Sequence, residues 1–580
     1  MISNIKNVSI LVSLLKEYKI KHIVLAPGAS DIPIIHVIER DEFFNCYSVV
    51  DERSMVYFAI GIAQQLNTPV ACVCTSGTAV SNFLPGMTEA YYRNTPIIAI
   101  TSDKDQYRQG QLETQKIEQN NIFGECCKKS VNLPVIRDEE EVWCCERLIN
   151  EALIELRHRG NGPVHINIPV IGDITSYSLS ALPRCKKIDL IDGINCEEFN
   201  VYTKNKINNY DKIMIIVGQD INFTEKQVKL LENFTRSHNA VIAVDHLSNI
   251  VCEGAVRTYP IVETKKELMD DLIPSLVISI GNNVASYDLK YILRRAKSVD
   301  HWQIDESGRI RDVFQHLTAV FECSISEFFS CIKCDTKIKN NYLELWKNEC
   351  KSIVVNNLPY SSFYIARELS KVIPENSILH LAVLNSIRLM QYFDLHKGVK
   401  TYGNLGALGI DGCLSTFMGQ AYSTERLAFC LLGDLSFFYD MNAAGIIHRK
   451  NNIRIILLNN HGAGEFYFTI GQEKLDTIDR HIAAVNNRVA KGWVESLGYE
   501  YYEVHNTHDA EDIMKKLVEK SDKPIFVEVF LNINDDTLVT KKVYSEYHHK
   551  ETKEIIKDAL RGAIGEKGVD IIKNVIRKRS

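Results

Sequence analysis

Short apolar runs rich in β-branched residues recur along the chain, and each is followed by turn residues and then by helically spaced apolar positions. This alternation predicts α/β layers around mostly parallel sheets. The first set of predicted strands is His22–Ala26, Pro69–Cys74, Pro96–Thr101 and Val164–Ile168. The second set is Lys212–Val217, Ala240–Val244, Leu276–Ile280 and His301–Ile304. The third set is Ile378–Val383, Leu427–Leu432, Ile453–Leu458 and Pro524–Leu531.

The three sets of strands predict three α/β domains. A chain of 580 residues is too long for one ordinary hydrophobic core, which agrees with this division. We expect the domains at residues 1–180, 205–335 and 355–540. A polar stretch from about Leu179 to Asn209, rich in Lys, Asp and Asn, is typical of a linker. Residues 541–580 carry many charges with spaced apolar positions, which predicts a charged helical tail.

Composition excludes several classes of function. Hydrophobic residues make up 45% of the chain and charged residues 24%, as in a soluble globular protein. The net charge of −6 and pI of about 6.3 do not suggest a nucleic-acid-binding protein. The start lacks the features of a signal peptide, and no apolar run is long enough to predict a membrane span. Sixteen cysteines without regular spacing indicate a reducing cytoplasm, and the single CxxC at Cys331 and Cys334 has no second half.

The strongest local signal is LLGDLSFFYDMNAAG followed by IRIILLNNHGAG. One predicted strand ends at Gly433-Asp434 and the next ends at Asn459-Asn460. The carboxyl ends of such strands are where open α/β sheets bind ligands. Carboxylate, amide and carbonyl oxygens are the ligands that Mg²⁺ prefers, which makes Asp434, Asn460 and the backbone of Gly462 candidates for a metal site.

The start of the helix after Asp434 is a candidate phosphate site. Gly433 and Ser436 could bring backbone and hydroxyl donors close to a phosphate at a helix N-terminus. The simpler alternative for the motif is a strand–turn–helix in which an Asp or Ser caps the helix. The paired strand that ends in Asn-Asn favours the metal site over this alternative.

At these residues the sequence resembles thiamine-diphosphate enzymes, whose pattern is Gly-Asp-Gly followed, one strand–helix–strand unit later, by Asn or Asn-Asn. The third position here is Leu435 instead of Gly. Gly-Asp-Leu-Ser with Tyr-Asp-Met-Asn after it resembles one branch, the 2-succinyl-5-enolpyruvyl-6-hydroxy-3-cyclohexene-1-carboxylate synthases of the menaquinone pathway. The resemblance implies thiamine diphosphate and Mg²⁺ as cofactors. It also implies a cofactor-binding set of Gly433, Asp434, Leu435, Ser436, Asn460 and Gly462, with Asp434, Asn460 and Gly462 on the metal.

The segment VVDERSMVYFAIGIAQQLNTPVACVCTSGTAVSNFLPGMTEAYYRNTPIIAITSD resembles the pyrimidine-binding domain of the same branch. The resemblance implies that Glu52 is catalytic and hydrogen-bonds the aminopyrimidine ring of the cofactor. By itself, Asp51-Glu52-Arg53 is also a common charged helix start. The resemblance further implies a turn beside the cofactor and a glutamine, Gln115, that faces the reacting centre. The residues of the turn are Ser76, Gly77 and Thr78.

In the third domain, LNSIRLMQYF and GNLGALGIDGCLSTFMG resemble two further segments of the family. They imply that Ser386 and Arg388 lie beside the cofactor and that Ile410 supports its bent conformation. The resemblance covers roughly residues 1–540. It implies the thiamine-diphosphate-enzyme fold, with pyrimidine-binding, central and diphosphate-binding domains in that order. In this superfamily Glu52 and Asp434 would belong to different subunits, so a homodimer or homotetramer with active sites at the subunit interface is expected.

The substrate region departs from the branch. Arginine forks are natural clamps for carboxylates. The family's Ser-Pro-Gly-Ser-Arg-Ser is Ala26-Pro27-Gly28-Ala29-Ser30-Asp31 here, and its Asn-Arg-Gly-Ala contains Leu405 in place of Arg. A basic pair of the middle domain falls at Tyr287-Asp288, and Lys104 stands where an arginine is expected. Ser30, Lys104 and Leu405 are therefore the candidate substrate residues. Each lost charge-assisted contact is worth about 1.5–3 kcal/mol.

The sequence thus predicts a carboligase, a transferase or lyase that decarboxylates a 2-oxo acid and transfers the acyl-anion equivalent to an acceptor. The missing arginines favour an acceptor other than the usual menaquinone substrates, such as a keto-sugar or an aldehyde. Three alternatives stay open: a genuine menaquinone-pathway synthase, a simple 2-oxo acid decarboxylase, and a non-catalytic relative. The presence of Glu52, Asp434 and Asn460 argues against the last.

Overall fold

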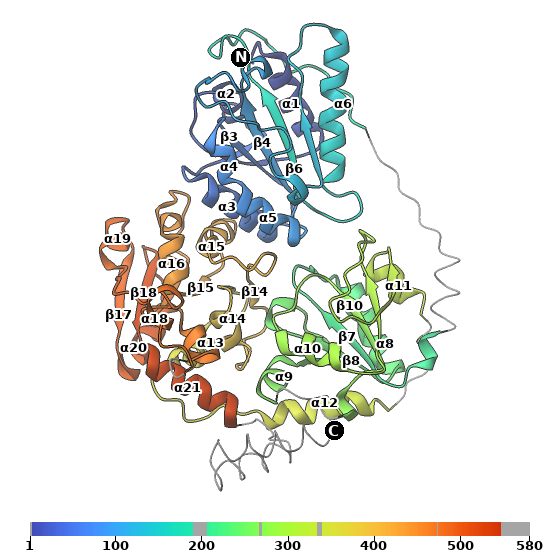
Figure 1. The fold of residues 1–580 in the computed structure, drawn as a ribbon, viewed down its shortest axis with the longest axis vertical. Coiled ribbons are helices and arrows are strands. Elements are labelled where there is room, and N and C mark those ends of the chain that lie inside the picture. The colour runs from blue at the N-terminus through green and yellow to red at the C-terminus, as the bar shows by residue number, and fades with distance from the viewer. Residues whose placement is uncertain are drawn as a thin grey trace, which may run out of the picture.

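The protein is described from a computed structural model that covers residues 3–188, 206–265, 270–332, 334, 339–471 and 474–546. Three six-stranded sheets, in which every pair of neighbouring strands is parallel, form three α/β domains. In Figure 1 the N-terminal domain lies above the other two, and its helices α3 and α5 face the C-terminal domain. The predicted three-domain α/β fold is confirmed.

The N-terminal domain has the strand order β2-β1-β3-β4-β6-β5. Its strands are β1 (His22–Leu25), β2 (Asn45–Ser48), β3 (Val70–Cys74), β4 (Ile97–Asp103), β5 (Lys129–Asn132) and β6 (Val164–Pro169). Its helices are α1 (Lys6–Glu17), α2 (Ile32–Glu39), α3 (Glu52–Leu66), α4 (Thr78–Asn82), α5 (Leu84–Tyr92) and α6 (Glu139–Glu155). Helices α1, α2 and α6 share one apolar core with the sheet, while α3 lies on the opposite face.

The central domain has the order β12-β11-β10-β7-β8-β9, the doubly wound arrangement of dinucleotide-binding sheets. Its strands are β7 (Ile213–Val217), β8 (Ala240–Val244), β9 (Ala255–Arg257), β10 (Leu276–Ile280), β11 (Asp300–Ile304) and β12 (Leu317–Phe321). Its helices are α8 (Glu225–Ser237), α9 (Tyr259–Lys265), α10 (Tyr287–Arg295), α11 (Ile325–Ser330) and α12 (Asn341–Ser352).

The C-terminal domain repeats the topology of the N-terminal one, with the order β14-β13-β15-β16-β18-β17. Its strands are β13 (Ile378–Leu381), β14 (Lys400–Tyr402), β15 (Ala428–Gly433), β16 (Ile453–Asn459), β17 (Glu500–Val504) and β18 (Ile525–Phe530). Its longer helices are α13 (Ser362–Val372), α15 (Cys413–Tyr422), α20 (Thr507–Leu517) and α21 (Ile533–Glu546). Its shorter helices are α14 (Asn385–Met390), α16 (Asp434–Tyr439), α17 (Gly464–Thr469), α18 (Ile478–His481) and α19 (Lys491–Ser496).

All twelve predicted strands are present, with ends that differ by two residues or less. The prediction missed six strands, β2, β5, β9, β12, β14 and β17, and these are the six edges of the three sheets. Edge strands are paired on one side only and are partly exposed, so they carry polar residues instead of an apolar run. Strand β2 reads NCYS and β14 reads KTY, and each has a single buried residue.

Two predicted segments fall largely beyond the structure. Residues 189–205 of the predicted linker and residues 547–580 of the predicted tail lie outside the described residues. The last described helix, α21, runs to Glu546 and so passes the predicted end of the third domain. Within the described ranges, no helix combines the length and apolar character that crossing a membrane requires.

Helices α3 and α15 join the N- and C-terminal domains through a backbone contact. A β-carbon at Gly61 would lie 2.1 Å from the carbonyl oxygen of Thr416, and one at Gly419 would lie 2.1 Å from the carbonyl oxygen of Phe58. Neither glycine can be replaced without separating the helices. Side chains of both helices belong to one apolar core that spans the two domains.

Replacing Gly419 by Ala should therefore lower the thermal unfolding midpoint. Forcing a side chain into a packed contact usually costs about 1–3 kcal/mol, and here the neighbour is backbone that cannot rotate away. A suitable control is Gly492→Ala in α19, where an added β-carbon meets no atom within 4 Å. Differential scanning calorimetry of both variants measures the effect. Equal midpoints for the two variants would contradict the proposed contact.

Candidate active site

A cavity of 380 Å³ lies at the carboxyl ends of β13, β15 and β16. The strand order of this sheet changes direction between β13 and β15, and ligands bind at such switch points in open α/β sheets. Eight residues predicted to bind the cofactor line the cavity: Ser386, Ile410, Gly433, Asp434, Leu435, Ser436, Asn460 and Gly462. Residues far apart in the sequence thus meet at one sheet edge.

Asp434 is the charged group at the centre of this edge. It starts α16 directly after β15, and the pairing of Gly433 with Leu458 places it beside the end of β16. Its carboxylate is 2% exposed and accepts a hydrogen bond from Asn486 Nδ2 at 3.2 Å. Burial raises the pKa of Asp434 to about 6, although hydrogen bonds oppose the rise. A bound cation would favour the ionised form.

The two asparagines at the end of β16 have different roles. Asn459 is fully buried, and its amide donates to the Arg488 carbonyl at 2.9 Å and to Glu528 Oε1 at 2.7 Å. It therefore holds the sheet together. Asn460 lines the cavity instead. Its hydrogen bond to Asp536 opposes the rise that burial causes in the pKa of Asp536, and an amide that donates through nitrogen keeps its oxygen for another ligand.

Small residues shape the space around Asp434. A β-carbon at Gly433 would meet no atom within 4 Å, so this position faces empty space at the mouth of the helix. A β-carbon at Gly462 would lie 2.9 Å from the Ala483 carbonyl oxygen, which leaves room for glycine alone. Ser436 Oγ donates to the Ile410 carbonyl at 3.0 Å and so ties α16 to the segment before α15. Hard oxygen donors beside an apolar cavity fit Mg²⁺ and a phosphate-bearing cofactor.

Arg388 does not line the cavity. It lies on α14 and forms an ion pair with Glu465, which does line it, and its guanidinium lies 5.8 Å from the centre of the Tyr287 ring. Sequence reasoning missed Glu465, and it also missed Leu384, which lines the cavity with φ at +65°. Such backbone is costly for a non-glycine residue and is concentrated at functional sites. The sequence carries no signal for it.

Glu52 is the first residue of α3, after the N-cap Asp51, whose side chain accepts from the backbone of Arg53 and Ser54. The Glu52 carboxylate is partly exposed, and its Oε2 accepts from Asn82 Nδ2 at 3.4 Å. No other hydrogen bond of this carboxylate occurs among the described residues. It is thus available to a ligand.

The predicted turn after β3 lies at the same sheet edge as Glu52. The hydroxyl of Ser76 is buried without a hydrogen-bond partner in the described structure. Gly77 has φ at +85°, which favours glycine, and its N–H donates to Gln119 Oε1 at 3.1 Å. Thr78 is exposed, and Gln115 is exposed and packs on Gly77, where a β-carbon would be 3.3 Å from its Cβ. Among the predicted residues, this edge therefore collects Glu52, Ser76, Gly77, Thr78 and Gln115.

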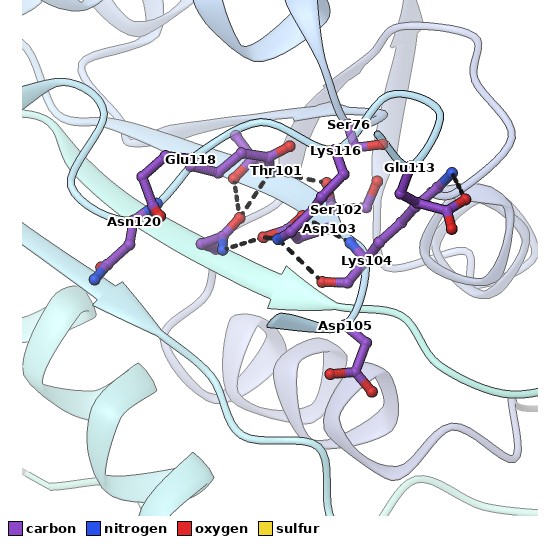
Figure 2. Close-up of polar contacts among 12 residues, drawn as sticks. Ser76, Thr101, Ser102, Asp103, Lys104, Asp105, Glu113, Lys116, Glu118 and Asn120 are labelled. Carbon is purple, nitrogen blue, oxygen red and sulfur yellow. Dashed lines mark hydrogen bonds and ion pairs between the residues drawn. The ribbon is translucent and has the colours of Figure 1, made fainter. Parts of the chain in front are cut away.

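A buried polar network supports this edge, as Figure 2 shows. Lys116 Nζ lies 2.9 Å from both carboxylate oxygens of Asp103, and this ion pair is almost fully buried. Gln119 donates to the Ser102 carbonyl and to Asn167 Oδ1. Sequence reasoning missed Asp103, Lys116 and Gln119. They lie in or beside an irregular loop, where polar residues are ordinary and no periodic pattern distinguishes them.

The structure places the three candidate substrate residues differently from one another. Ser30 Oγ contacts the hydroxyls of Thr75 at 2.7 Å and Ser102 at 2.9 Å, so it holds the turn. Lys104 Nζ lies 3.3 Å from Glu113 (Figure 2), and it also contacts the carbonyl of Thr114. Leu405 is 5% exposed and packs in an apolar core formed mainly by the C-terminal domain, and it does not line the cavity.

The predicted site residues form two separate groups within one chain. Every lining residue of the cavity in the described structure comes from positions 362–536, and Glu52, Ser76 and Gln115 are not among them. The two halves lie at equivalent edges of two sheets with the same strand order.

Two family models match the chain in these regions. The N-terminal TPP-binding domain of thiamine pyrophosphate enzymes matches residues 5–122, and the C-terminal TPP-binding domain matches residues 385–529. The chain belongs to the thiamine pyrophosphate enzyme family. It is therefore an enzyme that uses thiamine diphosphate with a divalent metal ion, typically Mg²⁺, as predicted from the sequence.

Curated relatives match nearly the whole length. A protein of Bacteroides thetaiotaomicron is 37% identical over 566 residues, which cover 95% of this chain and all of the relative. A protein of Bacteroides fragilis is 36% identical, covering 94% of this chain and all of the relative. One of Christiangramia forsetii is 30% identical and covers 90% and 95%. All three are named 2-succinyl-5-enolpyruvyl-6-hydroxy-3-cyclohexene-1-carboxylate synthase.

Replacing Asp434 by Asn should abolish the rise in thermal midpoint that thiamine diphosphate with Mg²⁺ produces. A ligand at 100 times its dissociation constant stabilises the native state by about 2.7 kcal/mol, and the variant lacks the carboxylate that is predicted to bind the metal. Asp512→Asn on the exposed face of α20 is a matched control that should keep the full shift. Differential scanning fluorimetry, with and without the cofactors, compares them.

In the protein without cofactors, Asp434→Asn should instead increase stability above about pH 6. Burial raises the pKa of Asp434 in the folded protein to about 6, whereas in the unfolded chain the group ionises at about pH 4. The wild-type apoprotein should therefore lose stability as pH rises from about 4 to 6. The variant should therefore be more stable than wild-type apoprotein at pH 8, by on the order of 2 kcal/mol, and similar to it at pH 4. An apo variant that is less stable at pH 8 would contradict this assignment.

Proposed function

We propose that this enzyme decarboxylates a 2-oxo acid and transfers the resulting acyl-anion equivalent to an acceptor, at a site that a second copy of the chain completes. The observation that carries the proposal is the presence of both half-sites in one chain, at equivalent sheet edges but without a shared cavity. In a symmetric dimer, the N-terminal half-site of each copy would pair with the C-terminal half-site of the other copy, which gives two complete sites.

The proposed roles follow from the placement of each residue. When bound, the cofactor supplies the electron sink that carbon–carbon bond cleavage requires. Glu52 would hold and return a proton through its partly exposed carboxylate. Asp434, Asn460 and the Gly462 carbonyl would hold the metal, and the backbone near Gly433 would face the diphosphate. The apolar walls of the cavity, including Ile410, would exclude water from the reacting centre.

For the substrates, the relatives support the menaquinone-pathway alternative better than our first interpretation of an altered acceptor. Three relatives at 30–37% identity over at least 90% of the chain carry the same synthase name. The first candidate pair is therefore 2-oxoglutarate as donor and isochorismate as acceptor.

A less anionic acceptor is the second candidate. The observation that favours it is that the nearby cationic side chains already form ion pairs within the protein. Arg388 is paired with Glu465, and Lys104 with Glu113. Ser30 and Leu405 supply no positive charge. Two multiply charged acids would need free cationic donors, and breaking an existing ion pair to provide one reduces the gain.

An assay of purified enzyme with thiamine diphosphate and Mg²⁺ separates the candidates. With 2-oxoglutarate and isochorismate, the first candidate predicts equal loss of both substrates and one carboligated product by mass spectrometry. Carbon dioxide release that leaves isochorismate unchanged would support the second candidate, which is then tested with pyruvate and aldehydes. Release of free aldehyde without any acceptor would identify a simple decarboxylase. Glu52→Gln is the control and should reduce carbon dioxide release at least 100-fold.

Subunit complementation tests the shared site. Glu52→Gln and Asp434→Asn should each be inactive alone. In a mixed dimer of the two variants, one site carries both changes and the other carries neither, so the purified mixed dimer should have about half of wild-type activity. Co-expression with two different affinity tags yields the mixed dimer for assay. Activity no higher than that of the single variants would contradict the shared site.

A further inference from the structure

The charged groups that line the active-site cavity are all acidic. Three carboxylates line it, those of Asp434, Glu465 and Asp536, and no Lys, Arg or His is among its lining residues in the described structure. Charges of one sign around a partly dry cavity repel a ligand group of the same sign unless a neighbour neutralises each of them. The partner of each carboxylate therefore determines which substrate groups the cavity accepts.

Two of the three carboxylates already have a partner or a predicted role. Asp434 is predicted to bind the metal ion. Asp536 is 8% exposed, accepts hydrogen bonds from N and Oγ of Ser362 at 2.7 Å each, and accepts another from Asn460. These contacts satisfy its oxygens from within the protein. Glu465 is the carboxylate that remains available to a substrate.

Glu465 is the second residue of α17 (Gly464–Thr469), and its side chain is 14% exposed. Its Oε2 accepts from Arg388 Nη1, and no other hydrogen bond of this carboxylate occurs among the described residues. A carboxylate has lone pairs on both oxygens. Oε1 can therefore accept a hydrogen bond from a ligand in the cavity.

Arg388 reaches the cavity only through Glu465. It does not line the cavity, whereas Leu389, which follows it on α14, does. Its guanidinium lies 5.8 Å from the centre of the Tyr287 ring of the central domain, and Glu465 is its only acidic partner in the part of the chain that the structure describes. A substrate carboxylate would have to displace Glu465 to pair with Arg388, which reduces the gain.

We propose that Glu465 is a specificity-determining residue for the 2-oxo acid: its carboxylate disfavours a second carboxylate on the side chain of that acid and accepts a hydrogen bond from an uncharged polar group there. Arg388 is a positioning residue that holds Glu465 at the wall of the cavity. This inference rests on the proposed function, because it concerns the substrate of the same site. It predicts how the preference changes when either residue is replaced, whichever of the two acceptors the enzyme uses.

Two 2-oxo acids that differ by one charge test the proposal. In 2-oxopentanoate a methyl group replaces the distal carboxylate of 2-oxoglutarate. The measured quantity is kcat/KM for carbon dioxide release, as the ratio of 2-oxoglutarate to 2-oxopentanoate, with thiamine diphosphate and Mg²⁺. In Glu465→Gln this ratio should rise about tenfold, the effect of one charge-assisted contact, because the repulsion is lost and Arg388 can pair with the distal carboxylate.

The partner residue gives a second variant with the opposite expectation. Arg388→Gln should lower the ratio, because the unpaired charge of Glu465 then faces the cavity. The double variant removes both charges and should return to within about threefold of the wild-type ratio. Ratios that change in the same direction in the two single variants would overturn the proposal.

Glu425→Gln is the matched control. Glu425 also forms an ion pair, with Lys450, but its side chain is 89% exposed and lies before the start of β15, whereas the cavity lies at the end of that strand. This variant should keep the wild-type ratio. A purely structural role of Glu465 would lower kcat for both acids by the same factor and leave the ratio unchanged, and that outcome would also overturn the proposal.

Binding tests the same point without turnover. Glutarate and pentanoate again differ by a carboxylate in place of a methyl group. In isothermal titration calorimetry with thiamine diphosphate and Mg²⁺ present, Glu465→Gln should bind glutarate about tenfold more tightly, relative to pentanoate, than wild type does. No relative gain in glutarate binding would overturn the proposal. Wild-type protein that releases carbon dioxide from neither 2-oxo acid would instead defeat the proposed function, and the binding comparison would still test the role of Glu465.

Discussion

The contact between the backbones of α3 and α15 is the constraint on which the arrangement of the site depends. Gly61 and Gly419 let the two helices approach until a carbonyl of one occupies the place of a side chain on the other. Helix α3 begins with Glu52, and the segment directly before α15 contains Ile410 and Asp411. The crossing therefore sets the distance between the half-sites of one chain.

Polar contacts at the ends of these helices keep the crossing in register. Arg53 lies 3.4 Å from Asp440 and donates to the Asp411 carbonyl, and Tyr57 donates to the Asp411 carboxylate at 3.1 Å. Asp440 is fully buried, and burial raises its pKa to about 7 against the opposing effect of the hydrogen bonds from Ser415. The apolar core that surrounds the crossing excludes water, which makes these few polar contacts directional and specific.

Buried carboxyl groups recur at the carboxyl edges of the two equivalent sheets, and the hydrogen-bond partners of their oxygens differ from one group to the next. Asp434 has one amide partner and oxygen capacity left for a metal ion. Asp440 is satisfied entirely by the protein. Asp31 has no hydrogen-bond partner in the described structure beyond its own backbone N–H. Burial thus raises the pKa of all three groups, while the groups that lie beside each carboxylate differ.

The sequence by itself determined the three-domain fold, the four central strands of each sheet and the cofactor. A strand that is buried on both sides needs a continuous apolar run, and a metal site at a strand end needs oxygen-bearing side chains, so both leave local patterns. The tertiary structure alone decided the six edge strands, because an edge needs no such run. It also decided that Asn459 holds the sheet while Asn460 faces the cavity, and that Leu405 is a core residue. The partner of Arg388 and the isolation of Asp31 depend on segments distant in the chain, and only their packing in space could reveal them.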